Sequence, residues 1–226
     1  MTLLNHLTND KDHSTKKTIL VRGIVGIGFL LMSMIPMAII GVLLAKVLNV
    51  DIHSLFQDYD VATKLTLRHS KNFAILYITL IAPIYEELSY RLGLSFKKWH
   101  IAISCGALTF FFLNWFTDIS IYSRAAIGVT IILLMGLLVK QKFGQNLDQK
   151  YKNIIIIISI LGFGLSHLIN YSTYEINAIP LYLLMLIPPI WMGAIMTYYR
   201  LNLGFIYGLL LHILINGGNM LFTYFL

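Results

Sequence analysis

The chain has 226 residues, of which 58% are hydrophobic and only 12% are charged, and its formal net charge is +7. Soluble domains contain about 45–50% apolar and about 25% charged residues, so this composition excludes a soluble globular protein and indicates a multi-pass membrane protein. The one cysteine, Cys105, excludes a disulfide within the chain and a four-cysteine zinc site. The basic residues lie mostly in short turns between apolar runs, where they signal topology and do not predict a nucleic-acid partner.

The apolar runs define the expected domain organisation. Residues 1–17 are polar and lack the order of a cleaved signal peptide, so we interpret them as a cytoplasmic tail. Residues 18–226 form a single membrane-embedded domain, which we expect to be an all-α bundle enclosing a polar catalytic cavity. About 20 apolar residues suffice to cross a bilayer. By that criterion, the sequence predicts seven spans, at residues 18–48, 72–94, 101–116, 121–139, 154–171, 179–199 and 203–226.

The spans are not expected to be regular throughout. The first is longer than a bilayer requires, so it should be tilted or bent near Pro36 and Gly41. Pro188 and Pro189 cannot donate into a helix and should kink the sixth span. An eighth membrane helix could lie in the long first span or in the polar loop at residues 51–71.

The distribution of lysine and arginine gives the orientation. Basic residues gather in the N-terminal tail, in the turns that hold Lys97 and Lys140, and at Arg200. The remaining turns are neutral, acidic or mixed. The positive-inside rule places these basic turns in the cytoplasm, so we predict a cytoplasmic N-terminus and a multi-pass protein of the plasma membrane.

Three charged residues interrupt the second span. Insertion of an ionised side chain near a bilayer centre costs roughly 2.5–3.5 kcal/mol, so such residues usually have a function. Glu87 and Arg91 are four residues apart and share a helix face, which predicts a structural ion pair. Glu86 is rotated about 100° away. We expect it to face the polar cavity and to act as a general base towards water. A coupling site of an ion transporter, or a purely structural network, would use the same residues.

Two later spans carry polar side chains at a spacing of four. Phe163 and His167 share one face of the fifth span, and His212 and Asn216 share one face of the last. Together with Glu86 they supply a carboxylate, two imidazoles and an amide. These groups are suited to activating a water and stabilising an oxyanion, and they favour a hydrolase.

The three motifs, Glu86-Glu87-x-x-x-Arg91, Phe163-x-x-x-His167 and His212-x-x-x-Asn216, occur in this order in apolar helices. In this the chain resembles the CAAX-protease and bacteriocin-processing (CPBP/Abi) family of intramembrane proteases, which includes the prenyl-protein endopeptidase. The resemblance covers residues 84–219. It implies that Glu86 and His167 activate the attacking water, that His212 and Asn216 support the oxyanion, and that Glu87, Arg91 and Phe163 hold the architecture of the site. The implied substrate is an amphipathic peptide or a lipidated, membrane-associated protein.

Three alternatives stay open in the sequence. Phe110 to Asn114 mimics the second motif with asparagine in place of histidine, but we prefer His167 because the chemistry requires an imidazole. The carboxylate and the two imidazoles (Glu86, His167 and His212) could bind one catalytic zinc ion, or could act without metal as we favour. The protein could also be a non-catalytic scaffold or immunity protein of the same fold. The span boundaries, finally, place Glu86 and His167 roughly 10 Å apart in depth, which a tilt or a bend after Pro83 would have to correct.

Overall fold

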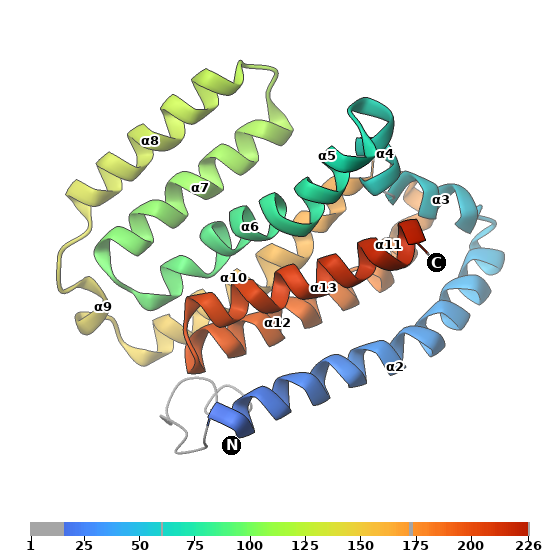
Figure 1. Ribbon diagram of the computed structural model, residues 1–226, viewed down its shortest axis with the longest axis horizontal. Coiled ribbons are helices and arrows are strands. Elements are labelled where there is room, and N and C mark those ends of the chain that lie inside the picture. Colours follow the sequence, from blue (N-terminus) through green and yellow to red (C-terminus); the bar gives the residue numbers. More distant parts are fainter. Residues whose placement is uncertain (1–15, 60, 172–173, 226) are drawn as a thin grey trace.

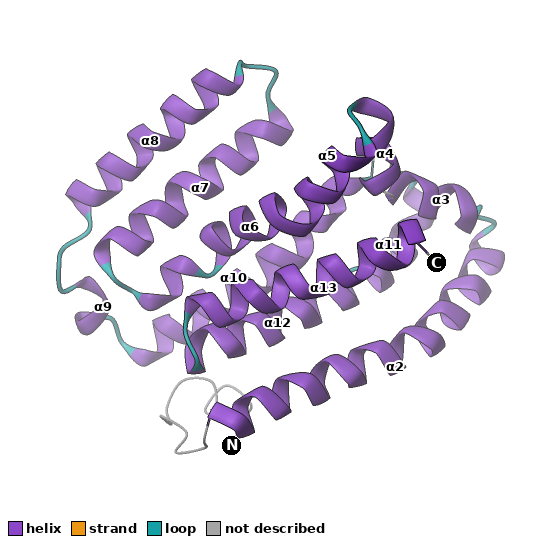
Figure 2. Ribbon diagram, in the orientation of Figure 1, coloured by secondary structure: helices purple, strands orange, loops and turns teal. Residues whose placement is uncertain are grey.

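The computed structural model describes residues 16–59, 61–171 and 174–225, and within them all regular structure is helical, with no strand (Figure 2). This agrees with the all-α class expected from composition. The α-helices are α2 (Lys16–Leu48), α3 (Ile52–Tyr59), α4 (Val61–Arg68), α5 (Lys71–Leu76), α6 (Ala82–Tyr90), α7 (Lys98–Phe116), α8 (Ile121–Leu138), α9 (Phe143–Asn146), α10 (Gln149–Ser166), α11 (Ile179–Met185), α12 (Ile187–Asn202) and α13 (Phe205–Phe225). Four short segments connect them: a π-helical turn η1 (Tyr77–Ile81) and the 3₁₀ turns η2 (Leu92–Ser95), η3 (His167–Asn170) and η4 (Ile176–Ala178).

Six stretches of the described chain are long and apolar enough to span a membrane, which indicates a multi-pass membrane protein. Between 11% and 33% of each apolar window is buried within the protein, so most of each helix surface is left for lipid. The six stretches are Lys16–Leu48, Lys71–Tyr90, Lys98–Phe116, Ile121–Leu138, Gln149–Asn170 and Ile176–Asn202. The apolar stretch of α13, Phe205–Leu221, is shorter, and the seventh crossing therefore stays a prediction.

The irregular points differ in part from those expected. Helix α2 is one continuous helix through Pro36 and Gly41, and its expected tilt or bend stays a prediction. The loop at residues 51–71 holds α3 and α4, of 8 residues each, which at about 1.5 Å per residue are too short to cross a bilayer. The sixth span is interrupted as predicted, at Leu186 between α11 and α12. Pro188 and Pro189 lie in the first turn of α12, where a missing N–H group costs no helical hydrogen bond.

The helices form a central group with one further unit on each side (Figure 1). Helices α6, α10, α12 and α13 make up the central group, the α7–α8 hairpin packs on α6, and α2 packs on α11 and α12. The contact of α2 is close, because a Cβ atom at Gly23 would lie 1.8 Å from the ring of Tyr199. The hydroxyl of Tyr199 donates to the Leu20 carbonyl at 2.9 Å, which ties the start of α2 to the central group.

Candidate active site

The segment that carries the acidic pair is one long helix with a wide turn in its middle. Helix α5 leads into the π-helical turn η1, where the N–H of Ala82 donates to the carbonyl of Tyr77, five residues earlier. If the π-helical pattern continued by one residue, the N–H of residue 83 would donate to the Ile78 carbonyl. Pro83 has no N–H group, so this carbonyl needs another donor. The side-chain amide of Asn216, on α13, donates to this carbonyl at 3.0 Å. Asn216 thus satisfies a backbone group that lipid could not.

The backbone carbonyls at the C-terminal end of α6 also accept hydrogen bonds from side chains of other helices. The last carbonyls of a helix lack an intrahelical partner, and inside a membrane no water replaces it. Side chains of three neighbouring helices supply the donors here. These hydrogen bonds run from Ser104 of α7 to the Leu88 carbonyl (2.7 Å), from Ser159 of α10 to the Tyr90 carbonyl, and from Arg200 of α12 to the carbonyls of Arg91 (3.1 Å) and Leu92 (3.4 Å). The end of α6, and with it the charged motif, is therefore fixed from several directions.

The predicted ion pair between Glu87 and Arg91 is present. Arg91 Nη1 lies 3.2 Å from Glu87 Oε1, and both side chains are fully buried, with 0% exposure. The Arg91 guanidinium lies over the ring of Phe163, with Cζ 3.8 Å from the ring centre. Glycine on α12 gives the guanidinium room, since a Cβ atom at Gly193 would lie 3.2 Å from Arg91 Nη2. Phe163 therefore supplies a cation–π surface for a charge that would otherwise be desolvated without compensation.

His212 joins the two carboxylates. Its Nδ1 lies 3.1 Å from Glu87 Oε1, and its Nε2 lies 3.4 Å from Glu86 Oε2. The imidazole side chain is 4% exposed, whereas the side chain of Glu86 is 21% exposed. Glu86 is thus the accessible carboxylate and Glu87 the buried one, which is the division expected from the helix geometry. Arg91, Glu87, His212 and Glu86 form a continuous chain of charged and polar groups between α6 and α13.

His167 lies at the end of α10, where its ring orientation is fixed. Its Nδ1 donates to the Phe163 carbonyl at 2.9 Å, which leaves Nε2 as the acceptor of the neutral ring. The ring of Phe163 contacts both imidazoles nearly at right angles, with ring centres 4.9 Å from His167 and 5.7 Å from His212. Phe163 thus holds Arg91 against its face and separates two histidines that come from different helices.

A cavity of about 440 Å³ lies beside these rings. Four of the residues that sequence reasoning singled out line it, namely Phe163, His167, His212 and Asn216. Apart from the two histidines, Asn216 and Asn219, its lining is apolar, so this cavity is less polar than expected and the enclosed polar cavity stays a prediction. The cause is the contribution of the neighbouring helices, which add five methionines: Met34, Met37, Met185, Met192 and Met196. Glu86 does not line the cavity, but its carboxylate contacts His212, which does.

The structure thus brings together the residues that the motifs singled out. Glu86, Glu87 and Arg91 meet His212 directly, and Phe163 connects them to His167. The expected depth difference between Glu86 and His167 is not an obstacle, because His212 touches the carboxylate and packs on the same phenyl ring as His167. The alternative residue Asn114 lies elsewhere. Its Oδ1 accepts from Arg124 Nη1 of α8 at 2.7 Å, as expected of a helix-packing group.

Sequence reasoning missed the residues that fix the end of α6. Arg200 was interpreted only as a topology signal, and Ser104 and Ser159 were not singled out at all. Each acts on a carbonyl that is distant in sequence, so no spacing pattern could reveal it. The one available signal was the end of an apolar helix at Arg91, inside the expected membrane depth, which requires donors from other helices.

The donor types of Glu86, His167 and His212 suit zinc. Among the residues described, however, no group of three or more His, Cys, Asp or Glu side chains is arranged to hold a metal ion. We therefore derive no step through a metal, and the zinc site stays a prediction.

Fold and site together define a multi-pass, all-helical membrane protein with a buried network of two carboxylates, an arginine and a histidine next to an apolar cavity. No family model matches the chain, and no curated protein and no solved structure matches it either. Function is therefore inferred from the geometry of the site and from the motif resemblance.

Proposed function

We propose that this protein is an intramembrane endopeptidase that hydrolyses a peptide bond in a membrane-associated or amphipathic peptide. The observation that carries the proposal is the position of His212 between Glu86 and Glu87, at a cavity also lined by His167 and Asn216. Carboxylate and imidazole groups in contact within a membrane bundle are the inventory for activating a water molecule. The resemblance of the three motifs to CAAX-type proteases supports the same reaction.

In the proposed reaction Glu86 takes a proton from the attacking water, because it is the more accessible of the two carboxylates. Glu87 is unsuited to this role, because its side chain is fully buried and its Oε1 already contacts Arg91 and His212. The water oxygen attacks the carbonyl carbon, and the proton held by Glu86 passes to the nitrogen of the leaving amine. The free Nε2 of His167 orients the water as a hydrogen-bond acceptor.

Stabilisation of the oxyanion is assigned to α13. His212 is assigned to the oxyanion through Nε2, which lies beside the accessible Glu86, because Nδ1 faces the buried Glu87. Asn216 retains a second N–H group besides the one that bonds the Ile78 carbonyl. Donors fixed before the reaction stabilise developing charge without reorganisation. The hydrogen bond from Asn216 to Ile78 therefore has two roles: it gives the Ile78 carbonyl a donor, and it orients the Asn216 amide towards the oxyanion.

The methionine-rich wall of the cavity bears on the substrate. Methionine side chains are unbranched and polarisable, so they adapt to apolar groups of irregular shape. Five of them line a space whose polar groups come mainly from the candidate catalytic residues. This supports a substrate that presents an apolar segment next to the scissile bond.

A second candidate function is ion-coupled transport. The observation that favours it is the shared imidazole, since a histidine between two membrane-embedded carboxylates could also pass a proton from one to the other. This alternative predicts proton flux and no cleaved product.

The proposal is tested by comparing membrane peptides from cells that carry wild type with those from cells that carry Glu86→Gln. A peptide that accumulates uncleaved in the variant is the expected result, because glutamine cannot accept the proton of the water. Glu175→Gln is the matched control, since Glu175 is an exposed carboxylate outside the site. It should leave all peptides unchanged.

Two results would overturn the proposal. One is an identical set of peptides in wild type and Glu86→Gln, with the cellular phenotype retained, which favours a scaffold. The other is proton flux in proteoliposomes that Glu86→Gln abolishes while no peptide changes, which favours transport. Metal analysis of the purified protein, with cleavage measured after chelation, decides separately whether zinc takes part.

A further inference from the structure

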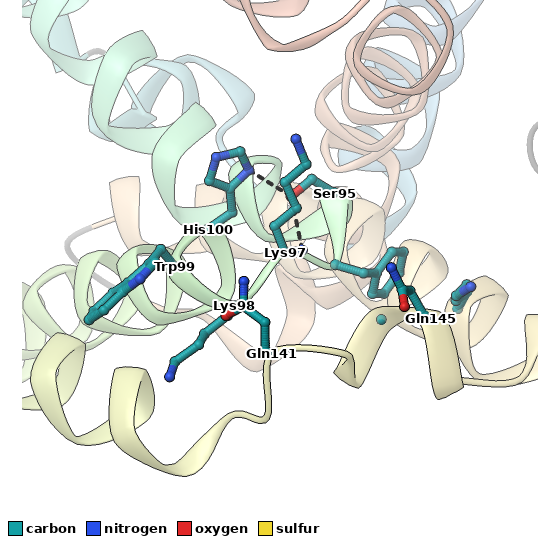
Figure 3. Close-up of a pocket in the computed structure, with 10 residues that line it drawn as sticks. Ser95, Lys97, Lys98, Trp99, His100, Gln141 and Gln145 are labelled. Carbon is teal, nitrogen blue, oxygen red and sulfur yellow. Dashed lines mark hydrogen bonds between the residues drawn. The ribbon is translucent and has the colours of Figure 1, made fainter.

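A second cavity, shown in close-up in Figure 3, shares no lining residue with the cavity of the candidate active site. It has a volume of about 590 Å³. The turn between α6 and α7 forms one side, and the chain from the end of α8 to the first turn of α10 forms the other. Its ten lining residues are Ser95, Phe96, Lys97, Lys98, Trp99, His100, Gln141, Gly144, Gln145 and Lys152. The proposed hydrolysis uses none of them.

The charge of this cavity has one sign. Lys97, Lys98 and Lys152 line it together with His100, and no aspartate or glutamate does. The three lysines form no ion pair with any carboxylate in the part of the chain that the structure describes. Two of the three ammonium groups have aromatic neighbours instead, with Lys98 5.6 Å from the Trp99 ring and Lys152 5.9 Å from the Phe96 ring. Positive charge is therefore concentrated here without an internal counter-charge.

Neutral hydrogen-bonding groups complete the lining. The side-chain amides of Gln141 and Gln145 face the same space, as Figure 3 shows. Ser95 Oγ is 2.7 Å from His100 Nδ1 and also accepts the backbone N–H of Lys97 at 3.2 Å (Figure 3). These bonds hold the turn in one conformation. The cavity thus combines lysine cations with amide donors, which suits an anion that has several oxygen atoms.

Close packing at two glycines shows that the walls are preformed. A Cβ atom at Gly144 would lie 2.3 Å from the Phe96 carbonyl oxygen, so α9 and the α6–α7 turn are in direct contact. A Cβ atom at Gly136 of α8 would lie 2.4 Å from the Trp99 ring. The left-handed backbone of Phe96, with φ 56°, completes the turn that brings these groups together. Little reorganisation is needed before a ligand can enter.

The position of the cavity indicates where its ligand comes from. Four apolar helices begin or end beside it, namely α6, α7, α8 and α10. Trp99 lines the cavity and is 53% exposed. Tryptophan is enriched at the level of the lipid headgroups. Basic pockets between membrane helices at this level suit anionic headgroups.

We propose that this pocket binds the phosphate of an anionic phospholipid headgroup, with the exposed face of Trp99 against the upper part of an acyl chain. The proposal is independent of the proposed proteolysis. A free phosphate shares the chemistry of the headgroup but gains nothing from Trp99 or from the position at the bilayer surface.

The test uses purified full-length protein in detergent micelles, and it follows thermal unfolding while lipid is added. Phosphatidylglycerol should raise the unfolding temperature, and phosphatidylcholine, which has no net charge, should have little effect. The triple variant Lys97→Ala/Lys98→Ala/Lys152→Ala should lose affinity for phosphatidylglycerol by roughly a hundredfold, since each lysine near the headgroup contributes on the order of fivefold.

The matched control is Lys140→Ala/Lys142→Ala/Lys150→Ala, which removes three exposed lysines from the same end of the bundle but outside the pocket. It should retain the affinity within about threefold. Equal losses in the two triple variants would overturn the proposal, because they would indicate general surface charge. Stabilisation by inorganic phosphate equal to that by phosphatidylglycerol would overturn the assignment to lipid. If the pocket variant does not fold, Lys→Arg changes at the same three positions replace it and should retain binding, and their loss of it would count against the proposal.

Discussion

The α7–α8 hairpin and the central group of helices hold together by different means. Between α7 and α8 the backbones meet at glycines, since a Cβ atom at Gly106 would lie 2.6 Å from the Gly128 carbonyl oxygen. The outer surface of α8 is apolar and open, with Leu137 81% exposed. In the central group, by contrast, polar side chains are buried, among them Glu87 and Arg91 at 0% exposure.

The difference follows from the solvent. Lipid is as apolar as leucine, so the hairpin gains nothing from burying apolar side chains and depends on close van der Waals contact. In the central group, several buried polar groups are instead paired across helices, such as Glu87 with His212 and the Ile78 carbonyl with Asn216, because an unpaired polar group in a membrane costs several kcal/mol. Packing of the first kind tolerates many apolar sequences, whereas the second kind fixes particular residues in particular positions. A site that requires precise geometry is found, as expected, in the second region.

The largest expected effect comes from breaking the buried ion pair. Glu87→Gln leaves the Arg91 charge in the protein interior without its partner, which typically costs about 3–5 kcal/mol. We expect a large drop in the unfolding temperature in detergent. Glu175→Gln, at an exposed position, should change stability by about 0.5 kcal/mol or less.

Removing both charges sharpens this result. The double variant Glu87→Leu/Arg91→Met should recover most of the lost stability, since an apolar pair of similar volume avoids the desolvation cost. If Glu87→Gln unfolds at the wild-type temperature, the ion pair does not hold the central group together.

A smaller effect is expected in the hairpin. Gly106→Ala places a Cβ atom 2.4 Å from Ile132 Cγ1 and 2.6 Å from the Gly128 carbonyl oxygen, so the helices must separate. Overpacking of this kind costs about 1–3 kcal/mol. Unfolding in detergent measures it. Gly28→Ala of α2 is the control, because no atom beyond the local backbone of its own helix lies within 4 Å of its added Cβ. Equal stability of the two variants would show that close contact does not hold α7 and α8 together.

The smallest effect, of about 1–2 kcal/mol, is expected for Asn216→Ala, which leaves the Ile78 carbonyl without a donor. Adding Pro83→Ala supplies a backbone N–H near this carbonyl and should recover the loss. A double-mutant cycle in thermal unfolding measures the coupling of the two positions. Pro36→Ala, in the exposed part of α2, should give no coupling with Asn216→Ala.

The same cycle separates the two roles of Asn216. If the amide only satisfies the backbone, the double variant Pro83→Ala/Asn216→Ala recovers both stability and peptide cleavage. If it also supports the oxyanion, as we propose, stability recovers and cleavage does not. Absence of coupling would show that Asn216 does not serve the Ile78 carbonyl.

The sequence predicted those features that depend on residues near one another in the chain. Apolar run length predicted seven spans, six of which coincide with helices long and apolar enough to cross a membrane, and a spacing of four predicted the Glu87–Arg91 pair. Consecutive prolines predicted the interruption between α11 and α12. Each of these follows from helix geometry or from a missing N–H group, which are local properties.

Contacts between distant segments could not be predicted in this way. The spacing of His212 and Asn216 placed them on one face, but not that His212 would touch both carboxylates or that Asn216 would bond the Ile78 carbonyl. The second contact depends on the wide turn before Pro83, and no residue type marks such a turn. The apolar lining of the cavity was missed because α2, α11 and α12 contribute to it.

The wide turn at Tyr77–Ile81 also affects how this segment should be compared with other sequences. A π-helical turn accommodates one residue more than an α-helical turn, so it shifts the angular phase of everything that follows by roughly 100°. A helical-wheel projection drawn straight through Lys71–Tyr90 would assign Glu86 and Glu87 to the wrong faces relative to α5. A relative that lacked the extra residue would present its acidic pair at a different angle, even if every motif residue were identical.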